Sequence, residues 1–163
     1  MPDVELPLTT RGRIALAIAR ALAAGRGDPD VTPTHMALGL LREGENGAVA
    51  LLDFRGRTSP TLRTALELAL GPSTGRPLPG EVVVPLTPGE GRLVAQARVE
   101  AEVHGHEYIG PEHLLLAILR DEHSPASKVF ATQGFDLASA AALVKQVVHT
   151  HPPSKRSSDA GKG

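Results

Sequence analysis

The stretch Tyr108–Arg120, YIGPEHLLLAILR, contains a proline, a histidine two residues later, and then a continuous run of apolar residues. A related stretch, Val31–Arg42, VTPTHMALGLLR, lies 78 residues earlier and keeps the proline, the histidine and the final Leu-Arg at the same positions. Proline suits the first turn of a helix, and an apolar run on all sides indicates a buried helix. We therefore predict buried helices over about 33–43 and 111–121.

The same offset relates much more of the chain. Residues 8–56 align with residues 86–134 without a gap, with 14 identities in 49 positions. Apolar periodicity and helix stop signals predict three further helices in each unit. They span about 10–24, 47–55 and 59–70 in the first unit, and about 88–104, 125–132 and 136–149 in the second. The first of these should present one apolar face, made of Ile14, Ala17, Ile18, Ala21 and Leu22.

These patterns predict an all-α fold of two tandem four-helix repeats. We expect a single double-repeat domain over residues 1–150, with repeat one at about 7–70 and repeat two at about 86–149. The prolines and glycines of about 71–85 predict a linker. Residues 151–163 have no apolar residue beyond one alanine, so we expect a disordered tail.

Composition excludes several classes of function. Seventeen basic and eighteen acidic residues give a formal charge of −1 without a basic stripe, which disfavours nucleic acid binding. The chain has no cysteine, no GxxxxGK phosphate loop and no GxSxG nucleophile motif. The longest apolar run, Leu114–Leu119, is too short to span a membrane, and the acidic N-terminus is unlike a signal peptide. These features predict a cytoplasmic protein that is not an enzyme and holds no cofactor.

The repeated phrase resembles a known signature. Residues 106–116 are similar to the Gly-His-x-Tyr-Ile-Gly-Thr-Glu-His-Leu-Leu-Leu motif of the Clp N-terminal (Clp repeat) domain, and Val31–Arg42 resembles a weaker copy. The resemblance implies two four-helix repeats with pseudo-twofold symmetry. It also implies a domain of ClpC-type AAA+ unfoldases that captures substrates, adaptors and phosphoarginine tags, and in actinobacteria cyclic-peptide antibiotics. This chain is similar to such a domain without the ATPase modules.

Six residues are candidates for ligand binding. The resemblance assigns phosphoarginine recognition to Glu112, whose counterpart in the first repeat is Thr34, while a glutamate at this place also stabilises a helix N-terminus. His35 and His113 match in the two repeats, and we expect each ring to bond a loop carbonyl and fix a helix start. Leu8 and Leu86 stand where relatives carry Phe, either as a ligand contact or as staples of the helix starts. The neighbouring residues His104, His106 and Glu107 could suggest a zinc site. Sequence spacing does not fix a third ligand for such a site, so we predict no metal binding.

The sequence thus favours a recognition module of the Clp protease system, acting as an adaptor, regulator or decoy. Its expected partners are Clp unfoldase or protease components and substrate or adaptor proteins. Two alternatives stay open. In the first, the protein would sequester cyclic-peptide antibiotics that target the ClpC N-domain. In the second, the chain would be an N-terminal fragment of a longer Clp ATPase.

Overall fold

The computed structural model describes residues 6–54, 60–73 and 87–150, without the side chains of residues 54 and 147–150. Within these ranges the chain forms eight helices and only one isolated β-bridge. The helices are α1 (Thr10–Arg26), α2 (Pro33–Glu43), α3 (Gly47–Phe54), α4 (Pro60–Leu70), α5 (Pro88–Val103), α6 (Pro111–Arg120), α7 (Pro125–Thr132) and α8 (Leu137–Thr150). The predicted all-α fold of two four-helix repeats is confirmed. Most of the predicted linker, Leu86 and the predicted tail lie outside the described residues.

The two repeats share their helix signals as well as their helices. Thr9 and Thr87 are the N-caps of α1 and α5, and each side chain accepts a hydrogen bond from a backbone N–H in the first turn. Gly27 and Gly105, which also lie 78 residues apart, have φ angles of 77° and 72° after these helices. Only glycine adopts this left-handed conformation without strain. The duplicated sequence is therefore duplicated in its backbone conformation.

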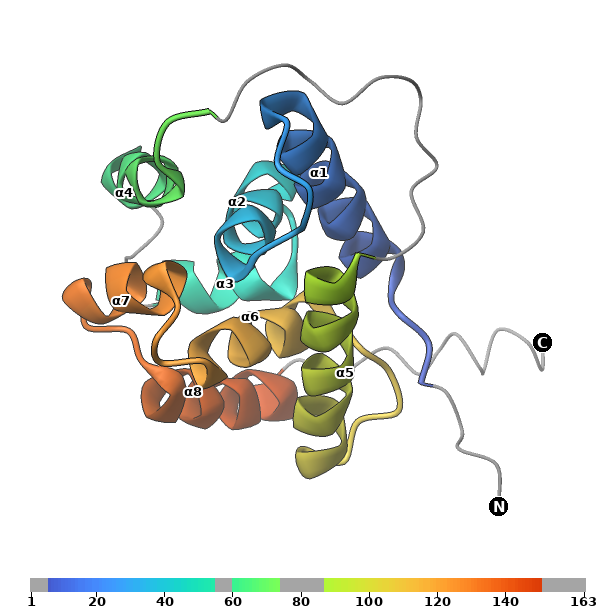
Figure 1. Ribbon diagram of the computed structural model, residues 1–163. Coiled ribbons are helices and arrows are strands. Elements are labelled where there is room, and N and C mark those ends of the chain that lie inside the picture. The colour runs from blue at the N-terminus through green and yellow to red at the C-terminus, as the bar shows by residue number, and fades with distance from the viewer. Residues whose placement is uncertain (1–5, 55–59, 74–86, 151–163) are drawn as a thin grey trace.

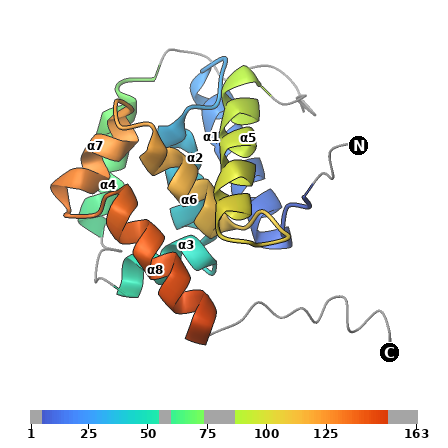
Figure 2. The same cartoon turned by 90° about the horizontal axis from the view of Figure 1, so that it is seen from below.

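The repeats interlock around a central pair of helices (Figure 1). Helix α2 of the first repeat packs against α6 of the second. The last helix of each repeat then packs on the third helix of the other, α4 on α7 and α8 on α3. Figure 2, the view from below, shows α8 beside α3 and α6. Each repeat completes the core of its partner, as a pseudo-twofold arrangement requires.

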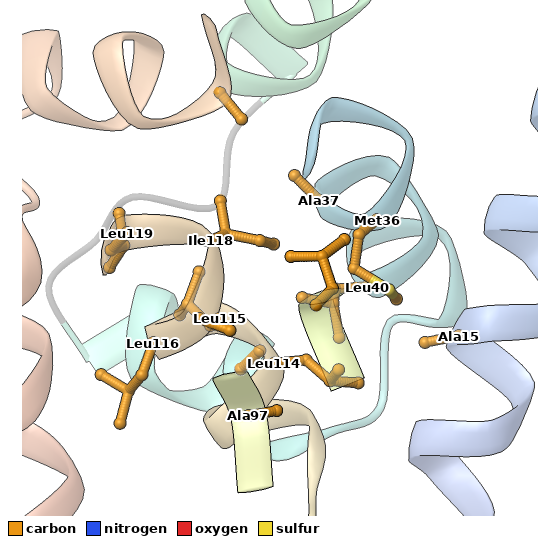
Figure 3. Close-up of a cluster of buried hydrophobic side chains, with 14 of the residues drawn as sticks. Ala15, Met36, Ala37, Leu40, Ala97, Leu114, Leu115, Leu116, Ile118 and Leu119 are labelled. Carbon is orange, nitrogen blue, oxygen red and sulfur yellow. The ribbon is translucent and has the colours of Figure 1, made fainter. Parts of the chain in front are cut away.

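Helix α6 lies in the middle of the core, as its apolar run predicts. Leu114, Leu115, Leu116 and Ile118 are all 0% exposed. Figure 3 shows the side chains of this helix beside those of α2, including Met36. Burying a leucine side chain stabilises a protein by about 1.5–3 kcal/mol, so this one helix contributes a large share of the core.

The predicted apolar face of α1 is only partly right: Leu22 packs against the core, but Ile14, Ala17 and Ala21 are exposed. Ile14 is 41% exposed, and the buried residues of the helix are instead Gly12, Ala15, Leu16, Ala19 and Ala23. The reason is the contact with α2 at Gly39. A β-carbon at Gly39 would lie 2.5 Å from the Ala15 carbonyl oxygen and 3.3 Å from the Ala19 β-carbon. At this separation small residues are needed where α1 meets Gly39, and Ala15 and Ala19 occupy these places while Ile14 lies exposed.

Two ion pairs with buried carboxylates hold the helices of the second repeat in place. Arg20 of α1 contacts both carboxylate oxygens of Glu90, which begins α5 and is 0% exposed. Arg120 at the end of α6 makes the equivalent two-pronged contact with Glu100, which is 1% exposed. Such paired contacts are geometrically specific, and removing one partner would leave a buried charge. The first pair links the two repeats directly.

The close contact at Gly39 gives a stability prediction. Gly39→Ala should lower the free energy of unfolding by about 1–3 kcal/mol, because α1 and α2 must move apart. Gly25→Ala is the matched control, since a β-carbon there meets nothing within 4 Å and the glycine does not have a positive φ. That change should raise stability by about 0.5–1 kcal/mol through helix propensity. Urea denaturation followed by circular dichroism measures both, and equal effects would contradict the packing argument.

Candidate functional site

A buried histidine stands at the start of each central helix. His35 and His113 are 2% and 0% exposed. The Nδ1 atom of His35 accepts a hydrogen bond from the Thr32 backbone N–H at 2.9 Å, and that of His113 accepts one from Gly110 at 2.9 Å. We expected a bond to a loop carbonyl, but in both repeats the ring is an acceptor. Each histidine therefore caps the N-terminus of its own helix, in the way a glutamate does in a capping box.

The second ring nitrogen has a different partner in each repeat. His35 Nε2 lies 2.9 Å from the carboxylate of Asp28, and His113 Nε2 lies 2.7 Å from Nδ1 of His106. Asp28 and His106 are 78 residues apart and so occupy equivalent positions. Since Nδ1 of each buried histidine accepts a backbone N–H, its Nε2 carries the proton and donates it. Both repeats thus place a partner at Nε2 of the buried histidine, but the partner is a carboxylate in the first repeat and an imidazole in the second.

The partly buried Glu112 side chain lies between Gly47 of the first repeat and Gly110 of the second, a place here called the Glu112 recess. The Tyr108 hydroxyl donates a hydrogen bond to its carboxylate at 3.1 Å. A β-carbon on Gly47, the first residue of α3, or on Gly110 would come within 2.7 or 2.6 Å of the Glu112 carboxylate. Both glycines are thus needed to admit the side chain. Burial raises the pKa of Glu112, and burial together with the Glu112 charge raises the pKa of Tyr108.

Thr34, the counterpart of Glu112, lines an open groove of about 310 Å³ together with His35. The groove lies between the start of α2, the end of α4 and the start of α7 and includes Asp28, Pro29, Asp30, Thr32, Ala69, Leu70 and Pro125. A second groove of about 290 Å³ shares Asp30 and Thr32 and is also lined by Arg92 of α5 and Arg120 at the end of α6. Sequence analysis missed Asp28, Asp30, Tyr108 and this continuity. The repeat offset alone relates Asp28 to His106 and Asp30 to Tyr108.

A metal site is the alternative use of the histidine cluster. Ligand atoms of His106, Glu112 and His113 lie within 4.8 Å of one another. For His113 to bind a metal through Nε2, its proton would have to move to Nδ1, which already accepts the Gly110 N–H. The cap hydrogen bond would then be lost. The donor set therefore fits a chain of hydrogen bonds better than a metal centre.

Leu8 lies just before α1 and links the first repeat to the second through backbone contacts with Ile109. It forms an isolated parallel β-bridge with Ile109. The Thr9 N–H donates to the Ile109 carbonyl at 3.0 Å, and the Ile109 N–H donates to the Pro7 carbonyl at 2.8 Å. The leucine side chain packs against the core and is partly buried. Its matching residue, Leu86, lies outside the described residues.

With this arrangement in place, comparison with known proteins is decisive. The sequence profile of the Clp repeat N-terminal domain matches residues 7–133 and 87–161. The chain belongs to the Clp repeat N-terminal domain family. Domains of this family are non-catalytic interaction domains. No helix within the described ranges is both long and apolar enough to span a membrane.

Relatives and solved structures agree with this assignment. The ClpC/MecB protein of Bacillus subtilis, a negative regulator of genetic competence, is 30% identical over 140 residues, which are 86% of this chain and 17% of that protein. An uncharacterized protein of Mycobacterium tuberculosis is 38% identical over 119 residues, covering 70% of this chain and 43% of that protein. The chain thus spans less than half of each of these relatives. The Hsp104 N-terminal domain of Candida albicans has a TM-score of 0.67 at 17% identity, covering 90% of this chain and 92% of that one.

The histidine network gives a pH prediction. Burial, with the nearby charges of His106 and His104, lowers the pKa of His113 to about 3. An unfolded histidine binds a proton below pH ~6.5, so the unfolded state gains protons first and stability should fall as the pH drops from about 6.5 towards 3. The slope from this one group is at most about 1.4 kcal/mol per pH unit. Urea unfolding at pH 7 and pH 5 measures it.

Two variants separate the contributions. His113→Asn keeps an acceptor near the Nδ1 position but cannot take up the proton, so its stability should depend less on pH in this range. Glu112 acts in the opposite sense, because its raised pKa lets the folded state hold a proton more firmly than the unfolded state above pH ~4.5. Glu112→Gln should therefore steepen the loss on acidification. Equal slopes in all three proteins would contradict the assignment.

Proposed function

We propose that this protein is a non-enzymatic recognition module of the Clp protease system that binds substrate proteins, adaptors or phosphoarginine-type tags. Clp N-domains bind adaptors or substrates, and the match to this family extends over nearly the whole chain. One similar solved structure, with a TM-score of 0.66 at 22% identity, is described as a peptide from the SciI protein of the type VI secretion system of an E. coli strain. The module acts as an adaptor, regulator or decoy according to which component it holds.

The observation that carries the tag-reading part of this proposal is the position of Glu112. A carboxylate pairs with a guanidinium through two parallel hydrogen bonds, and such a pair is strong where water is restricted. Glu112 is partly buried and already accepts a hydrogen bond from the Tyr108 hydroxyl. A guanidinium would offset the cost of ionising this half-buried acid. The first repeat offers Thr34 at this place, so tag reading belongs to the second repeat.

One departure from the family signature reduces the number of hydrogen-bond donors beside Glu112. Pro111 is buried directly before Glu112, where the signature has threonine. Proline supplies no backbone N–H and no hydroxyl. Recognition at this site therefore depends on Glu112 and Tyr108 more than on backbone donors.

A binding assay tests the tag-reading role. A fluorescent peptide carrying one phosphoarginine should bind the full chain, and Glu112→Gln should weaken binding at least about tenfold, because the amide removes the charge of the ion pair. Glu107→Gln is the control, since Glu107 is an exposed carboxylate on the same loop. Fluorescence anisotropy measures all three proteins. An equal loss in both variants would indicate general charge attraction instead of recognition.

The wider role needs a separate test. The tagged full chain is incubated with the cognate Clp unfoldase and its peptidase, and co-purification of either supports the proposal. Recovery of neither, together with no binding of phosphoarginine-bearing protein, would overturn it.

A further inference from the structure

The groove at the start of α2 has a chemical character that the proposed function does not use. Its described lining contains two carboxylates, Asp28 and Asp30, and two hydroxyls, Thr32 and Thr34, but no lysine or arginine. Arg26 contacts Asp28 and Arg92 lies 3.9 Å from Asp30, both from outside this lining. Its other wall is apolar, formed by Pro29, Ala69, Leu70 and Pro125. A long side chain with an apolar stem and a cationic end matches both walls. At about 310 Å³ the groove is near the lower limit for small-ligand pockets, which suits one such side chain.

The Thr34 hydroxyl is an independent sign of a ligand. Thr34 is only 2% exposed, and its hydroxyl forms no hydrogen bond with any described residue. The hydroxyl is not among the fully enclosed polar atoms of the described residues, and Thr34 lines the groove. Buried polar groups are normally paired. An unpaired hydroxyl facing a groove is therefore suited to an external donor.

Asp30 determines which charge this groove accepts. Its carboxylate accepts the Gly89 N–H at 2.8 Å and the Val31 N–H at 2.9 Å. A β-carbon on Gly89 would lie 2.8 Å from both carboxylate oxygens, so the glycine admits this close approach. Glu90 N–H and Gly91 N–H bond to Thr87, and Pro88 has no N–H. The N-terminus of α5, which would otherwise attract an anion, is thus occupied by an internal carboxylate.

The second repeat has no carboxylate equivalent to Asp30. The position equivalent to Asp30 is Tyr108, and the first turn of α1 has no acidic residue. The two repeat-related positions therefore differ in charge, although their backbones match. Partial burial opposes ionisation of Asp30, but hydrogen bonds from Thr87, Gly89 and Val31 and the charge of Arg92 together lower its pKa, so it stays negative at neutral pH.

We infer that the groove of the first repeat binds an unmodified guanidinium side chain of a partner protein and rejects its phosphorylated form. The guanidinium donates to Asp30 and Thr34, while its methylene stem lies against Leu70 and Pro125. Asp28 adds negative charge, although Arg26 and His35 already contact it. A phosphoryl group would face these carboxylates at a helix end that Asp30 has already filled, so like-charge repulsion excludes it.

Three capped tripeptides test the inference on the full chain. They carry arginine, phosphoarginine or norleucine between two glycines, and NMR titration follows the backbone amides of residues 28–35. The arginine peptide should shift these amides in a saturable way, and the other two should not. Saturable shifts from the phosphoarginine peptide equal to those from the arginine peptide would overturn the inference, as would no shift from arginine.

Variants tie the binding to the groove. Thr34→Val removes the hydroxyl with little change in volume and should weaken the arginine peptide roughly fivefold to tenfold, and Asp30→Asn should weaken it by at least as much. Asp121→Asn is the control, because this exposed carboxylate lines the neighbouring groove only. If Asp30→Asn does not fold, Thr34→Val alone decides. Unchanged affinity in Thr34→Val would overturn the inference.

The test is separate from that of the proposed function. Glu112→Gln acts on the recess of the second repeat and should leave arginine binding at residues 28–35 unchanged. A protein that fails to bind Clp components can still show this binding, and the reverse also holds. A loss of the arginine shifts in Glu112→Gln would show that the two sites are not distinct and would contradict the inference.

Discussion

The contact between α2 and α6 is the constraint on which the rest of the structure depends. Both helices are apolar almost all round, so each needs cover on every side. Part of the cover comes from the helix's own repeat, α1 and α4 for α2 and α5 and α8 for α6. The rest comes from the other repeat, because α6 and α7 pack on α2, while α1 and α3 pack on α6. Because α4 also rests on α7, and α8 on α3, neither repeat can bury its central helix alone. Duplication was therefore a condition of stability, as in other repeat architectures.

This interlocking also explains where the candidate sites lie. The start of α2 faces the start of α7, and the start of α6 faces the start of α3, so each recess takes residues from both repeats. Pro125 lines the groove beside Thr34, and Gly47 closes the recess around Glu112. The first backbone N–H groups of a helix have no partner within its hydrogen-bond ladder, so side chains gather at a helix start to satisfy them. Sites at these two places are thus a consequence of the packing, and their chemistry depends on a few side chains.

Sequence reasoning predicted the helices well because their signals are local. Prolines at the first helical position, threonine caps and apolar periodicity need no tertiary information. Most of the predicted apolar face of α1 was wrong because Gly39, a residue of another helix, sets how closely α1 approaches. The groove also needed tertiary structure, since Asp30 and Gly89 are 59 residues apart and only the fold brings them together. The repeat offset already shows that Asp28 and His106 occupy equivalent positions. It does not reveal that each of them contacts a buried histidine.

Each repeat keeps the same histidine cap while its surroundings have diverged. The cap fixes the tautomer of the ring, so the second nitrogen must find an acceptor. An aspartate at that place adds a negative charge to the groove, whereas a neutral imidazole adds none. The adjoining positions follow the same division, with Asp30 and Thr34 in one repeat and Tyr108 and Glu112 in the other. One backbone geometry therefore surrounds its buried histidine with carboxylates in the first repeat and with an imidazole, a phenol and one carboxylate in the second, and the difference follows from which side chains satisfy the buried donors.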